Sequence, residues 1–219
     1  MSSKPNSQPA EIVRVDPDAV DADVVARVAK MLQRGGVVAA PTDTVYGFLA
    51  SVNRLDALER LVDLKLRPKK KPFLLLASDW ISVRSVTSSL PSVGRALGAR
   101  YWPGPLTLIL PADPSLPDAV VSAGPTVAVR IPGSALLRAI VAETGCAIAA
   151  PSANHTGEEP ASTAAEVAER FGKELDLILD GGPASTAKAS TLVNCTGREG
   201  EVLRRGPIEL TPDELKERA

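Results

Sequence analysis

Apolar residues along the chain follow either a helical period or short continuous runs. Between Asp21 and Arg34 they recur at helical spacing and stop at Gly35-Gly36, which predicts an amphipathic helix ended by glycine. Four further stretches follow the helical pattern: 53–64, 91–101, 134–143 and 163–171. We expect Asn53 to cap the first of these and Leu55 to face the core, because polar caps and apolar stripes mark helix starts.

Short apolar runs bounded by turn-forming residues predict strands between these helices. The runs cover 37–41, 48–52, 73–77, 106–112, 126–132, 146–151 and 175–180. Residues 190–196 and 201–206 are expected to form a strand pair that turns at 197–200. Because helices and strands alternate throughout, the sequence predicts an α/β architecture.

One globular domain is predicted over residues 11–210. The chain has 219 residues, of which 44% are apolar, enough to bury a sizeable core in one domain. Residues 1–10 are polar and contain proline, so we expect a disordered N-terminus. The segment from Thr211 to Glu214 matches a capping box, which predicts a short C-terminal helix over 211–219.

Charge and cysteine content narrow the functional classes. The 25 basic and 26 acidic residues nearly balance, which argues against nonspecific binding of nucleic acid through the net charge. Cys146 and Cys195 lie in apolar, strand-like runs, as expected for buried reduced thiols in the cytosol. No segment has the apolar core of a signal peptide or the length of a membrane span, so we expect a cytoplasmic protein without membrane contact.

Common catalytic signatures are missing from the sequence. There is no GxxxxGK[ST] phosphate loop, no GxGxxG segment after a strand and no cysteine or histidine cluster spaced for a metal. We therefore expect no protein-bound metal. The single histidine, His155, lies in a polar loop without a serine or cysteine partner motif, and is expected to be exposed and noncatalytic. Covalent hydrolase chemistry is therefore disfavoured.

Polar loops follow the ends of several predicted strands. They are PTDTVYG (41–47), KLRPKKKP (65–72), VAVRIPG (127–133), PSANHTG (151–157), STLVN (190–194) and LRRG (203–206). Ligands of α/β proteins bind where such loops converge. These loops offer hydroxyls, an amide and cations but no obvious base, a mixture that suits phosphate and carboxylate ligands.

Each of these loops also has a purely structural explanation. PTDTVYG and PSAN could be ordinary turns, because Pro, Thr, Asp, Asn and Gly favour turns. Lys65 and Arg67 could clamp a polyphosphate or could simply belong to a solvated helix end. Arg130 could bind a ligand carboxylate or pair with a carboxylate of the chain. Ser190 could be an ordinary strand start, and Arg204 could be a solvated residue of an edge strand.

Taken together and in this order, the segments resemble the YrdC-like family of threonylcarbamoyl-AMP synthases. The matching motifs run from Val37 to Ile208: PTDTVYG, K-x-R-P, PGP-L-T, A-V-R-x-P, SAN-x-[ST]-G, S-T-x-x-N and L-R-x-G. The resemblance implies a mixed, twisted, open sheet with helices on both faces, of the YrdC/RibB-like type, enclosing a concave cavity. It also implies condensation of L-threonine, bicarbonate and ATP to threonylcarbamoyl-adenylate, with release of pyrophosphate.

By motif position, the resemblance also implies roles for particular residues. Those implied to bind threonine are Thr42, Arg130, Ala150 through its backbone, and Ser190. Those implied to bind ATP are Lys65, Arg67, Ser152, Asn154 and Arg204, with Lys65 and Arg67 also catalytic. The implied cofactor is Mg²⁺ with ATP, and the implied partner is the transferase assembly that modifies tRNA. Leu76 stands where many family members carry a histidine, so this contact differs here.

Two other functions compete with synthesis of the adenylate. The run Lys69-Lys70-Lys71 would suit a double-stranded RNA or ribosome-associated binding protein of the same fold, or direct contact with tRNA, although the near-neutral net charge argues against it. Carbamoyl-adenylate chemistry on another acceptor, as in the related domain of hydrogenase-maturation carbamoyltransferases, is the third hypothesis.

Overall fold

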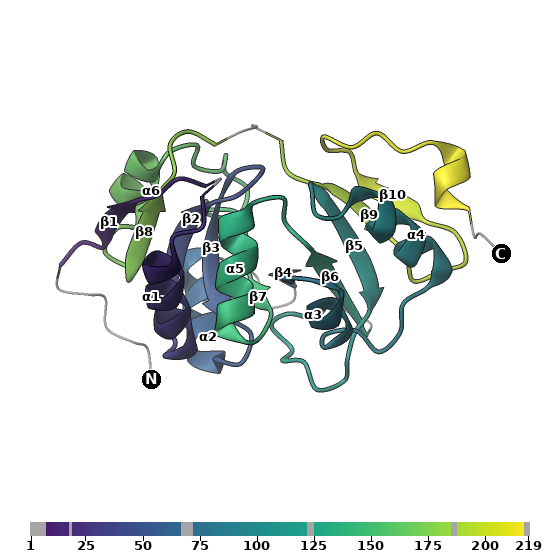
Figure 1. Ribbon diagram of the computed structural model, residues 1–219, viewed down its shortest axis with the longest axis horizontal. Helices are drawn as coiled ribbons and strands as arrows, with labels where there is room; N and C mark the ends of the chain where they lie inside the picture. Colours follow the sequence, from purple (N-terminus) through teal and green to yellow (C-terminus); the bar gives the residue numbers. More distant parts are fainter. Residues whose placement is uncertain (1–7, 18, 67–71, 122–124, 185–187, 217–219) are drawn as a thin grey trace.

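The computed structural model describes residues 8–17, 19–66, 72–121, 125–184 and 188–216 (Figure 1). Within them the chain forms one ten-stranded mixed sheet with the strand order β1-β8-β2-β3-β7-β4-β6-β5-β9-β10. The strands are β1 (Glu11–Arg14), β2 (Val38–Pro41), β3 (Tyr46–Ser51), β4 (Leu74–Leu76), β5 (Leu106–Pro111), β6 (Thr126–Arg130), β7 (Ile148–Ala149), β8 (Leu177–Asp180), β9 (Thr191–Asn194) and β10 (Glu201–Arg204). The α/β class with a mixed sheet is therefore confirmed.

Helices pack on both faces of this sheet. They are α1 (Ala22–Gln33), α2 (Leu55–Leu64), α3 (Trp80–Arg84), α4 (Ser92–Tyr101), α5 (Ala135–Thr144), α6 (Ala164–Phe171) and the 3₁₀ helix η1 (Pro212–Leu215). Figure 1 shows α1 and α5 side by side in front of the sheet, and their apolar residues share a core with alternate residues of β2, β3 and β8. The opposite face forms a larger core with α2, α4 and α6.

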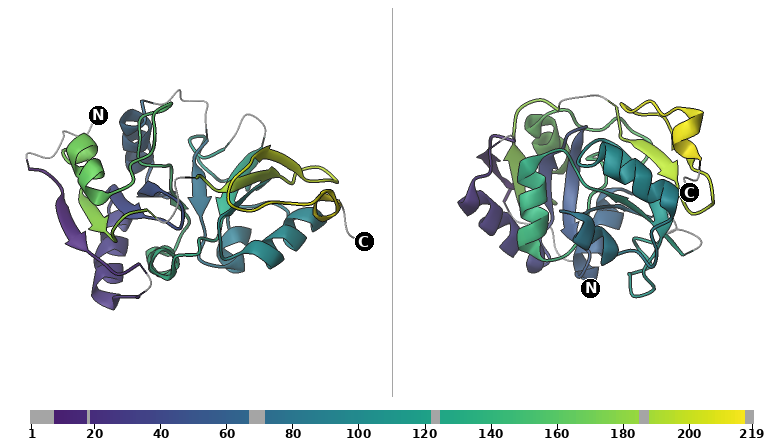
Figure 2. Two further views of the ribbon diagram at one scale, coloured as in Figure 1. Left: turned by 90° about the horizontal axis from the view of Figure 1, so that it is seen from above. Right: turned by 45° about the vertical axis from the view of Figure 1, so that its right-hand side comes forward.

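The elements fall into two groups joined by the short central strands β4 and β7. One group contains β1, β8, β2 and β3, and the other contains β6, β5, β9 and β10 (Figure 2). Strand β7 pairs antiparallel with both β3 and β4, so two residues of β7 connect the groups within one sheet. A hollow between the groups consequently receives side chains from segments far apart in the sequence.

Polar side chains cap the starts of α1 and α5, and the predicted glycine follows the end of α1. The carboxylate of Asp21 accepts the backbone N–H groups of Asp23 and Val24 at 2.9 and 3.2 Å, and α1 is followed by Gly35 with φ +89°. Helix α5 begins after Ser134, whose hydroxyl accepts from the backbone of Leu137. Such caps satisfy backbone groups that the helix itself leaves unpaired.

Helix α2 departs from the sequence prediction at its start. Its N-cap is Arg54 rather than Asn53, with no side-chain cap hydrogen bond, and Leu55 is 63% exposed instead of facing the core. The buried stripe is Ala57, Leu58, Leu61 and Leu64. Because the helix begins at Leu55, that residue lies in the first turn outside the stripe, and Arg54 pairs with Asp56 on the surface.

Two short elements were not predicted, β1 and α3. Strand β1 lies at an edge of the sheet and pairs with β8 only, and its four residues are largely exposed, so no apolar run marks it. Helix α3 has five residues, capped by the Asp79 carboxylate, which accepts the backbone N–H of Ser82. Elements this short carry too few positions for an apolar period to be visible.

Both cysteines are free thiols, as expected. Cys195 is buried, and burial raises the pKa of its thiol to about 12, so it stays protonated at neutral pH. Cys146 is only partly buried, with its sulfur 3.1 Å from the Ser51 hydroxyl, which corrects the expectation of full burial. None of the helices in the described ranges combines the length and the apolarity needed to cross a bilayer.

The C-terminal turn is fastened to α4 by one carboxylate. Glu214, 9% exposed, accepts the Tyr101 hydroxyl at 2.6 Å and Arg100 at 3.1 Å through one oxygen. Its other oxygen accepts the backbone N–H and the hydroxyl of Thr211, both at 2.9 Å, completing the predicted capping box. Of the helix predicted over 211–219, the structure describes residues 211–216, and within these Pro212–Leu215 form a single 3₁₀ turn. Residues 217–219 lie outside the described residues.

Glu214 is predicted to make stability depend on pH. The hydrogen bond from Tyr101, followed by those from Thr211, lowers the pKa of Glu214 from 4.5 to about 2. A carboxyl group whose pKa falls on folding stabilises the protein above its unfolded pKa, and this contribution is lost as the pH drops from about 4.5 toward about 2. We expect Glu214→Gln to lower the melting temperature at pH 7 by roughly 2–6 °C.

The same difference should be much smaller at pH 2.5, because the unfolded chain is then protonated at Glu214, and it should vanish below about pH 2, where the folded protein is protonated as well. Asp213→Asn is the control, since Asp213 pairs with Lys216 on the exposed surface and such pairs contribute little. A melting-temperature difference for Glu214→Gln that is equal at pH 7 and at pH 2.5 would contradict this role.

Candidate functional site

The hollow between the two groups of elements is a cavity of about 540 Å³. Its floor is the sheet face that α1 and α5 leave uncovered. Alternate residues of four adjacent strands reach it, while the residues between them, such as Leu75 and Val129, are buried in the core with α4. The lining residues on the floor are Leu74, Leu76, Thr107, Ile109, Ala128, Arg130, Ser190 and Leu192.

The wall opposite the floor comes from the turn between β2 and β3 and from the segment after β7. Thr42, Asp43, Thr44 and Val45 supply one part, and Ala150, Pro151 and Ser152 supply the other. These segments meet because Gly47 and Ser152 form an isolated β-bridge. At Gly47 a Cβ atom would approach the Pro151 carbonyl oxygen to 3.2 Å, so glycine permits this close approach.

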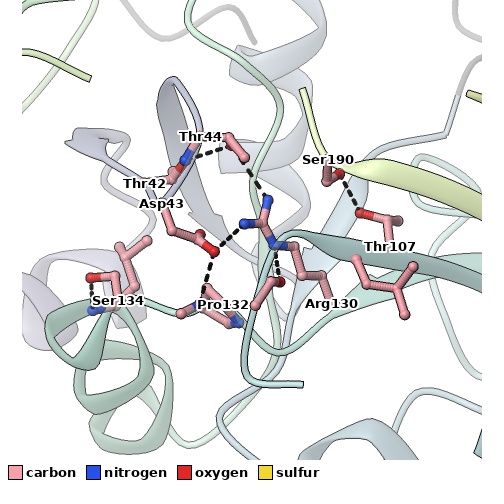
Figure 3. A network of polar contacts seen from close by, with 12 residues as sticks. Thr42, Asp43, Thr44, Thr107, Arg130, Pro132, Ser134 and Ser190 are labelled. Carbon is pink, nitrogen blue, oxygen red and sulfur yellow. Dashed lines mark hydrogen bonds and ion pairs between the residues drawn. The ribbon is translucent and has the colours of Figure 1, made fainter. Parts of the chain in front are cut away.

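Arg130 is the central cation of the cavity (Figure 3). It is 3% exposed, and its guanidinium forms an ion pair with the Asp43 carboxylate. Its Nε donates to the Gly104 carbonyl oxygen at 2.9 Å, and one Nη contacts the Thr44 hydroxyl at 3.4 Å. Burial lowers the pKa of Arg130 and the Asp43 charge opposes this shift; because an arginine titrates far above neutral pH, the group remains a cation.

The Thr42–Val45 turn holds its shape through the Thr42 hydroxyl. This oxygen donates to the Val45 carbonyl at 2.7 Å and accepts the backbone N–H groups of Thr44 and Val45 at 3.1 and 3.2 Å. Such side-chain to backbone bonds define tight turns of Ser and Thr. Thr42 therefore lines the cavity and also stabilises a turn, so the alternative prediction that PTDTVYG forms a turn is correct as well.

Ser190, Thr107 and Arg204 form a second polar group at the far side of Arg130. The hydroxyls of Ser190 and Thr107 are 2.7 Å apart and both side chains are buried. Arg204 donates to the Ser190 carbonyl oxygen at 3.0 Å and to its hydroxyl at 3.3 Å. Burial, and then the charge of Arg130, lower the pKa of Arg204, which indicates that the two cations lie close together.

Lys65 lies behind Ser152 and connects α2 to the segment after β7. It is 3% exposed, and its ammonium donates to the Ser152 carbonyl and to the Asn154 side-chain oxygen, both at 2.7 Å. The Ser152 hydroxyl donates to the same Asn154 oxygen at 2.5 Å. Lys65, Ser152 and Asn154 therefore form one hydrogen-bonded group at the edge of the cavity.

His155 is partly buried and structural, which corrects the expectation that it is exposed. Its Nδ1 lies 2.9 Å from the Leu64 carbonyl oxygen, at the end of α2, and its ring packs edge-on against Phe171. The next residue, Thr156, donates through its backbone and its hydroxyl to the Lys65 carbonyl at 2.9 Å each. The PSANHTG segment is thereby fixed to the end of α2 that carries Lys65.

The structure brings together most of the residues singled out in the sequence. Six of them line the cavity: Thr42, Arg130, Ala150, Ser152, Ser190 and Arg204. Two more, Lys65 and Asn154, adjoin the cavity through their hydrogen bonds with Ser152. Ala150 is bound at its backbone N–H by the Leu74 carbonyl. Arg67 and the Lys69–Lys71 run lie outside the described residues, so their proposed phosphate and RNA contacts stay predictions.

Sequence reasoning missed Asp43, Thr44 and Thr107 as site residues. Asp43 and Thr44 stand inside the singled-out PTDTVYG segment, and their neighbourhood to Arg130 arises only from folding. Thr107 is a polar residue within an apolar strand, in register beside Arg130 since Leu108 pairs with Val129. The one sequence signal for Thr107 was its position between Leu106 and Leu108, because side chains alternate along a strand and Thr107 must therefore point to the sheet face opposite these two leucines.

The fold and the cavity define an α/β protein whose open sheet carries a cavity suited to a small anionic ligand. The cavity offers two guanidinium groups and several hydroxyls, with one carboxylate among its described lining residues. Guanidinium groups bind carboxylates and phosphates through paired hydrogen bonds. A family model named Sua5_yciO_yrdC and described as "Telomere recombination" matches residues 30–206, and the chain belongs to this family.

Several characterised proteins are similar to this chain. A threonylcarbamoyl-AMP synthase of Bacillus subtilis (strain 168) is 37% identical over 185 residues, covering 84% of this chain and 54% of that protein. One from Nitrosococcus oceani is 35% identical over 180 residues, covering 82% and 96%. The crystal structure of Pyrococcus abyssi Sua5 complexed with L-threonine superposes with a TM-score of 0.83 at 31% identity, covering 91% of this chain and 58% of that one. The chain thus spans about half the length of the first of these relatives.

The Thr107–Ser190 contact is predicted to couple the two hydroxyls energetically. Thr107→Val removes one hydroxyl from a buried pair, which costs about 0.5–1.5 kcal/mol of the free energy of unfolding. In a double-mutant cycle with Ser190→Ala, urea unfolding should give a coupling of at least about 0.5 kcal/mol.

Thr87→Val is the matched control for this cycle. Its buried hydroxyl donates to the Val83 carbonyl at 3.0 Å, away from the cavity, so its effect should add to that of Ser190→Ala. Strict additivity for Thr107 and Ser190 as well would show that their contact contributes nothing to stability.

Proposed function

We propose that this chain is an L-threonylcarbamoyladenylate synthase, a nucleotidyltransferase that condenses L-threonine, bicarbonate and ATP and releases pyrophosphate. The observation that carries the proposal is the buried Arg130 guanidinium in a cavity shared with Arg204 and Ser152. The relatives named threonylcarbamoyl-AMP synthase and the threonine complex of Pyrococcus abyssi Sua5 support the choice of ligand.

Arg130 is the proposed receptor for the threonine carboxylate. Its Nη2 pairs with one oxygen of Asp43 and its Nη1 contacts Thr44, and because each Nη carries two N–H groups, both can also donate to a ligand. The proposed contacts to the rest of the amino acid are Thr42, the backbone of Ala150, and Ser190, which line the cavity around Arg130. Hydroxyl groups in a small pocket are suited to select a hydroxylated side chain.

Lys65, Ser152, Asn154 and Arg204 are the proposed ATP contacts, together with Arg67. Lys65 and Arg204 are cations at the edge and in the lining of the cavity, and each is bound to oxygen atoms that a phosphate oxygen could replace as acceptor. We assign Lys65 and Arg67 the catalytic role of neutralising the phosphates during nucleotidyl transfer, where positioning and charge supply most of the rate enhancement.

The proposed reaction joins two anions and therefore needs cations around it. The neutral threonine amine attacks the carbon of bicarbonate and water leaves, or it adds to carbon dioxide and releases a proton. An oxygen of the resulting carbamate attacks the α-phosphorus of ATP. The bond from that phosphorus to the bridging oxygen of pyrophosphate breaks, and pyrophosphate leaves with the electron pair. Arg130 holds the amino acid at one end, while Lys65 and Arg204 hold the nucleotide at the other.

Mg²⁺ is the proposed cofactor, entering with ATP. Within the described residues no three His, Cys, Asp or Glu side chains are grouped to cage a metal. This fits a cation that is held mainly by nucleotide phosphates and water, as Mg²⁺ commonly is. When bound, Mg²⁺ would neutralise phosphate charge that the arginines and Lys65 share.

The product would serve tRNA modification in the cytoplasm. A mixed anhydride of a carbamate and AMP is an activated acyl donor, so a second protein must accept it before water does. We propose that the partner is the transferase assembly that places the threonylcarbamoyl group on tRNA, with direct contact between this chain and tRNA as a further prediction.

The direct test is pyrophosphate release from ATP. Purified protein with ATP, Mg²⁺ and bicarbonate should release pyrophosphate only when L-threonine is present, and the adenylate should be detected by mass spectrometry. Release that does not depend on threonine would falsify the proposal. Carbamoyl phosphate in place of bicarbonate and threonine separates the synthase from carbamoyl-adenylate chemistry on another acceptor.

Arg130→Lys and Lys65→Ala should affect different substrates. Lysine lacks the planar fork of arginine, so Arg130→Lys should raise the KM for threonine about 10- to 100-fold and change the KM for ATP far less. Lys65→Ala should act mainly on ATP and on kcat.

Arg60→Lys is the control for these variants, because Arg60 pairs with Asp176 outside the cavity. It should leave both KM values unchanged. A threonine KM that Arg130→Lys leaves at the wild-type value would rule out Arg130 as the carboxylate receptor.

A further inference from the structure

Asp43 is the one acidic side chain among the described residues that line the cavity. One of its carboxylate oxygens pairs with Arg130 and also accepts the backbone N–H of Gly133 at 3.0 Å. Figure 3 shows this carboxylate between Arg130 and the Pro132–Ser134 segment that leads into α5. A single carboxylate therefore links the turn that carries it to two other segments, β6 and the loop before α5, and it is the one fixed negative charge among the described lining residues.

The position of Asp43 alters what Arg130 can bind. A cation that is 3% exposed is costly to bury alone, and the neighbouring carboxylate offsets that cost. A ligand carboxylate that binds Arg130 consequently also approaches a like charge. Attraction to the guanidinium and repulsion by Asp43 act over similar distances and largely cancel for a simple anion.

A zwitterion meets the same pair of charges differently. Its carboxylate is attracted by Arg130, while its ammonium group is attracted by Asp43, so both ends gain. Arg204, at the far side of Arg130, is assigned to the nucleotide, so the charges beside the amino acid are those of Arg130 and Asp43, which sum to zero like those of a zwitterion. The arrangement of charges is complementary to an α-amino acid rather than to a carboxylate alone.

We propose that Asp43 is a specificity-determining residue that makes the cavity select zwitterionic α-amino acids over carboxylate anions that lack an amino group. The inference rests on the proposed function, because it takes threonine as the occupant of the site beside Arg130. It adds to that function a residue that excludes the many hydroxy acids and simple anions whose carboxylates would otherwise fit the guanidinium.

A purely structural role for Asp43 makes a different prediction. Asp43 could serve only to fasten the Thr42–Val45 turn to Gly133 and to orient Arg130. Removing it would then weaken the binding of every carboxylate ligand by the same factor. The ratio of two affinities therefore separates the roles, whereas the affinity for threonine alone does not.

The experiment compares two ligands of equal shape. L-threonine and the dihydroxy acid in which a hydroxyl replaces the threonine amino group are titrated calorimetrically into the full chain at pH 7, without nucleotide. Wild type should prefer threonine. Asp43→Asn, which keeps the shape of the side chain and removes its charge, should lower the preference at least about tenfold, while Asp43→Glu should retain most of it.

Asp176→Asn is the matched control. Asp176 also pairs with an arginine, Arg60, at 2.8 Å, accepts a backbone N–H from Val37 at 2.7 Å and is about as exposed as Asp43, but it lies outside the cavity. Its loss should lower the melting temperature and leave the ligand preference unchanged. Circular dichroism identifies any variant that has unfolded.

Three outcomes would overturn the proposal. An unchanged preference in folded Asp43→Asn, with both affinities lowered equally, would leave Asp43 with a structural role only. A drop in preference of the same size in Asp176→Asn would show that the effect comes from general destabilisation. Absence of threonine binding to wild type would count against the proposed amino-acid site itself, which is a failure distinct from the first two.

Discussion

The site depends on the Arg130 guanidinium, which must stay charged and fixed in orientation although it is almost completely buried. Arg130 is 3% exposed, and two separate segments supply its partners: the β2–β3 turn through the Asp43 carboxylate and the Thr44 hydroxyl, and the loop before β5 through the Gly104 carbonyl. A buried charge without such partners is strongly destabilising. The β2–β3 turn, the loop before β5 and strand β6 must therefore assemble together, so the charge that we propose binds the ligand also fixes the geometry around it.

The cavity itself results from unequal covering of the sheet. Helices α1 and α5 cover one face over β2, β3 and β8, whereas the same face of β6, β5 and β9 carries the polar floor of the cavity. The opposite face is covered along its length by α2, α4 and α6. The uncovered part of the sheet face forms a rigid floor, because the strand register fixes the neighbours of Arg130. Thr107 of β5 lies on one side of Arg130, and Leu76 of β4 lies on the other. Leu76 makes that side apolar.

Elements with a clear period or a capping residue could be predicted from the sequence, and the contacts between them could not. Helix α1 and helix α5 carry both an apolar stripe and a cap, and their ends agree with the prediction. The predicted start of α2 was wrong. Asn53 is a favourable N-cap by residue type, but the packing of Leu58 and Leu61 against the core decides which residues of the helix face inward and where it begins. The candidate site residues came from motifs, yet Asp43 and Thr107 were missed, since their importance lies in neighbours 87 and 83 residues away along the chain.

The internal hydrogen bonds of Lys65 have a consequence for the proposed reaction. Its ammonium is bound by the Ser152 carbonyl and the Asn154 side chain. In that reaction, a phosphate that reached Lys65 would exchange one set of acceptors for another, and the net gain would be smaller than for an ammonium without such partners. The exchange would temper affinity and would let the same oxygen atoms recapture the ammonium when pyrophosphate departs, so the protein's own acceptors would return the site to its starting arrangement.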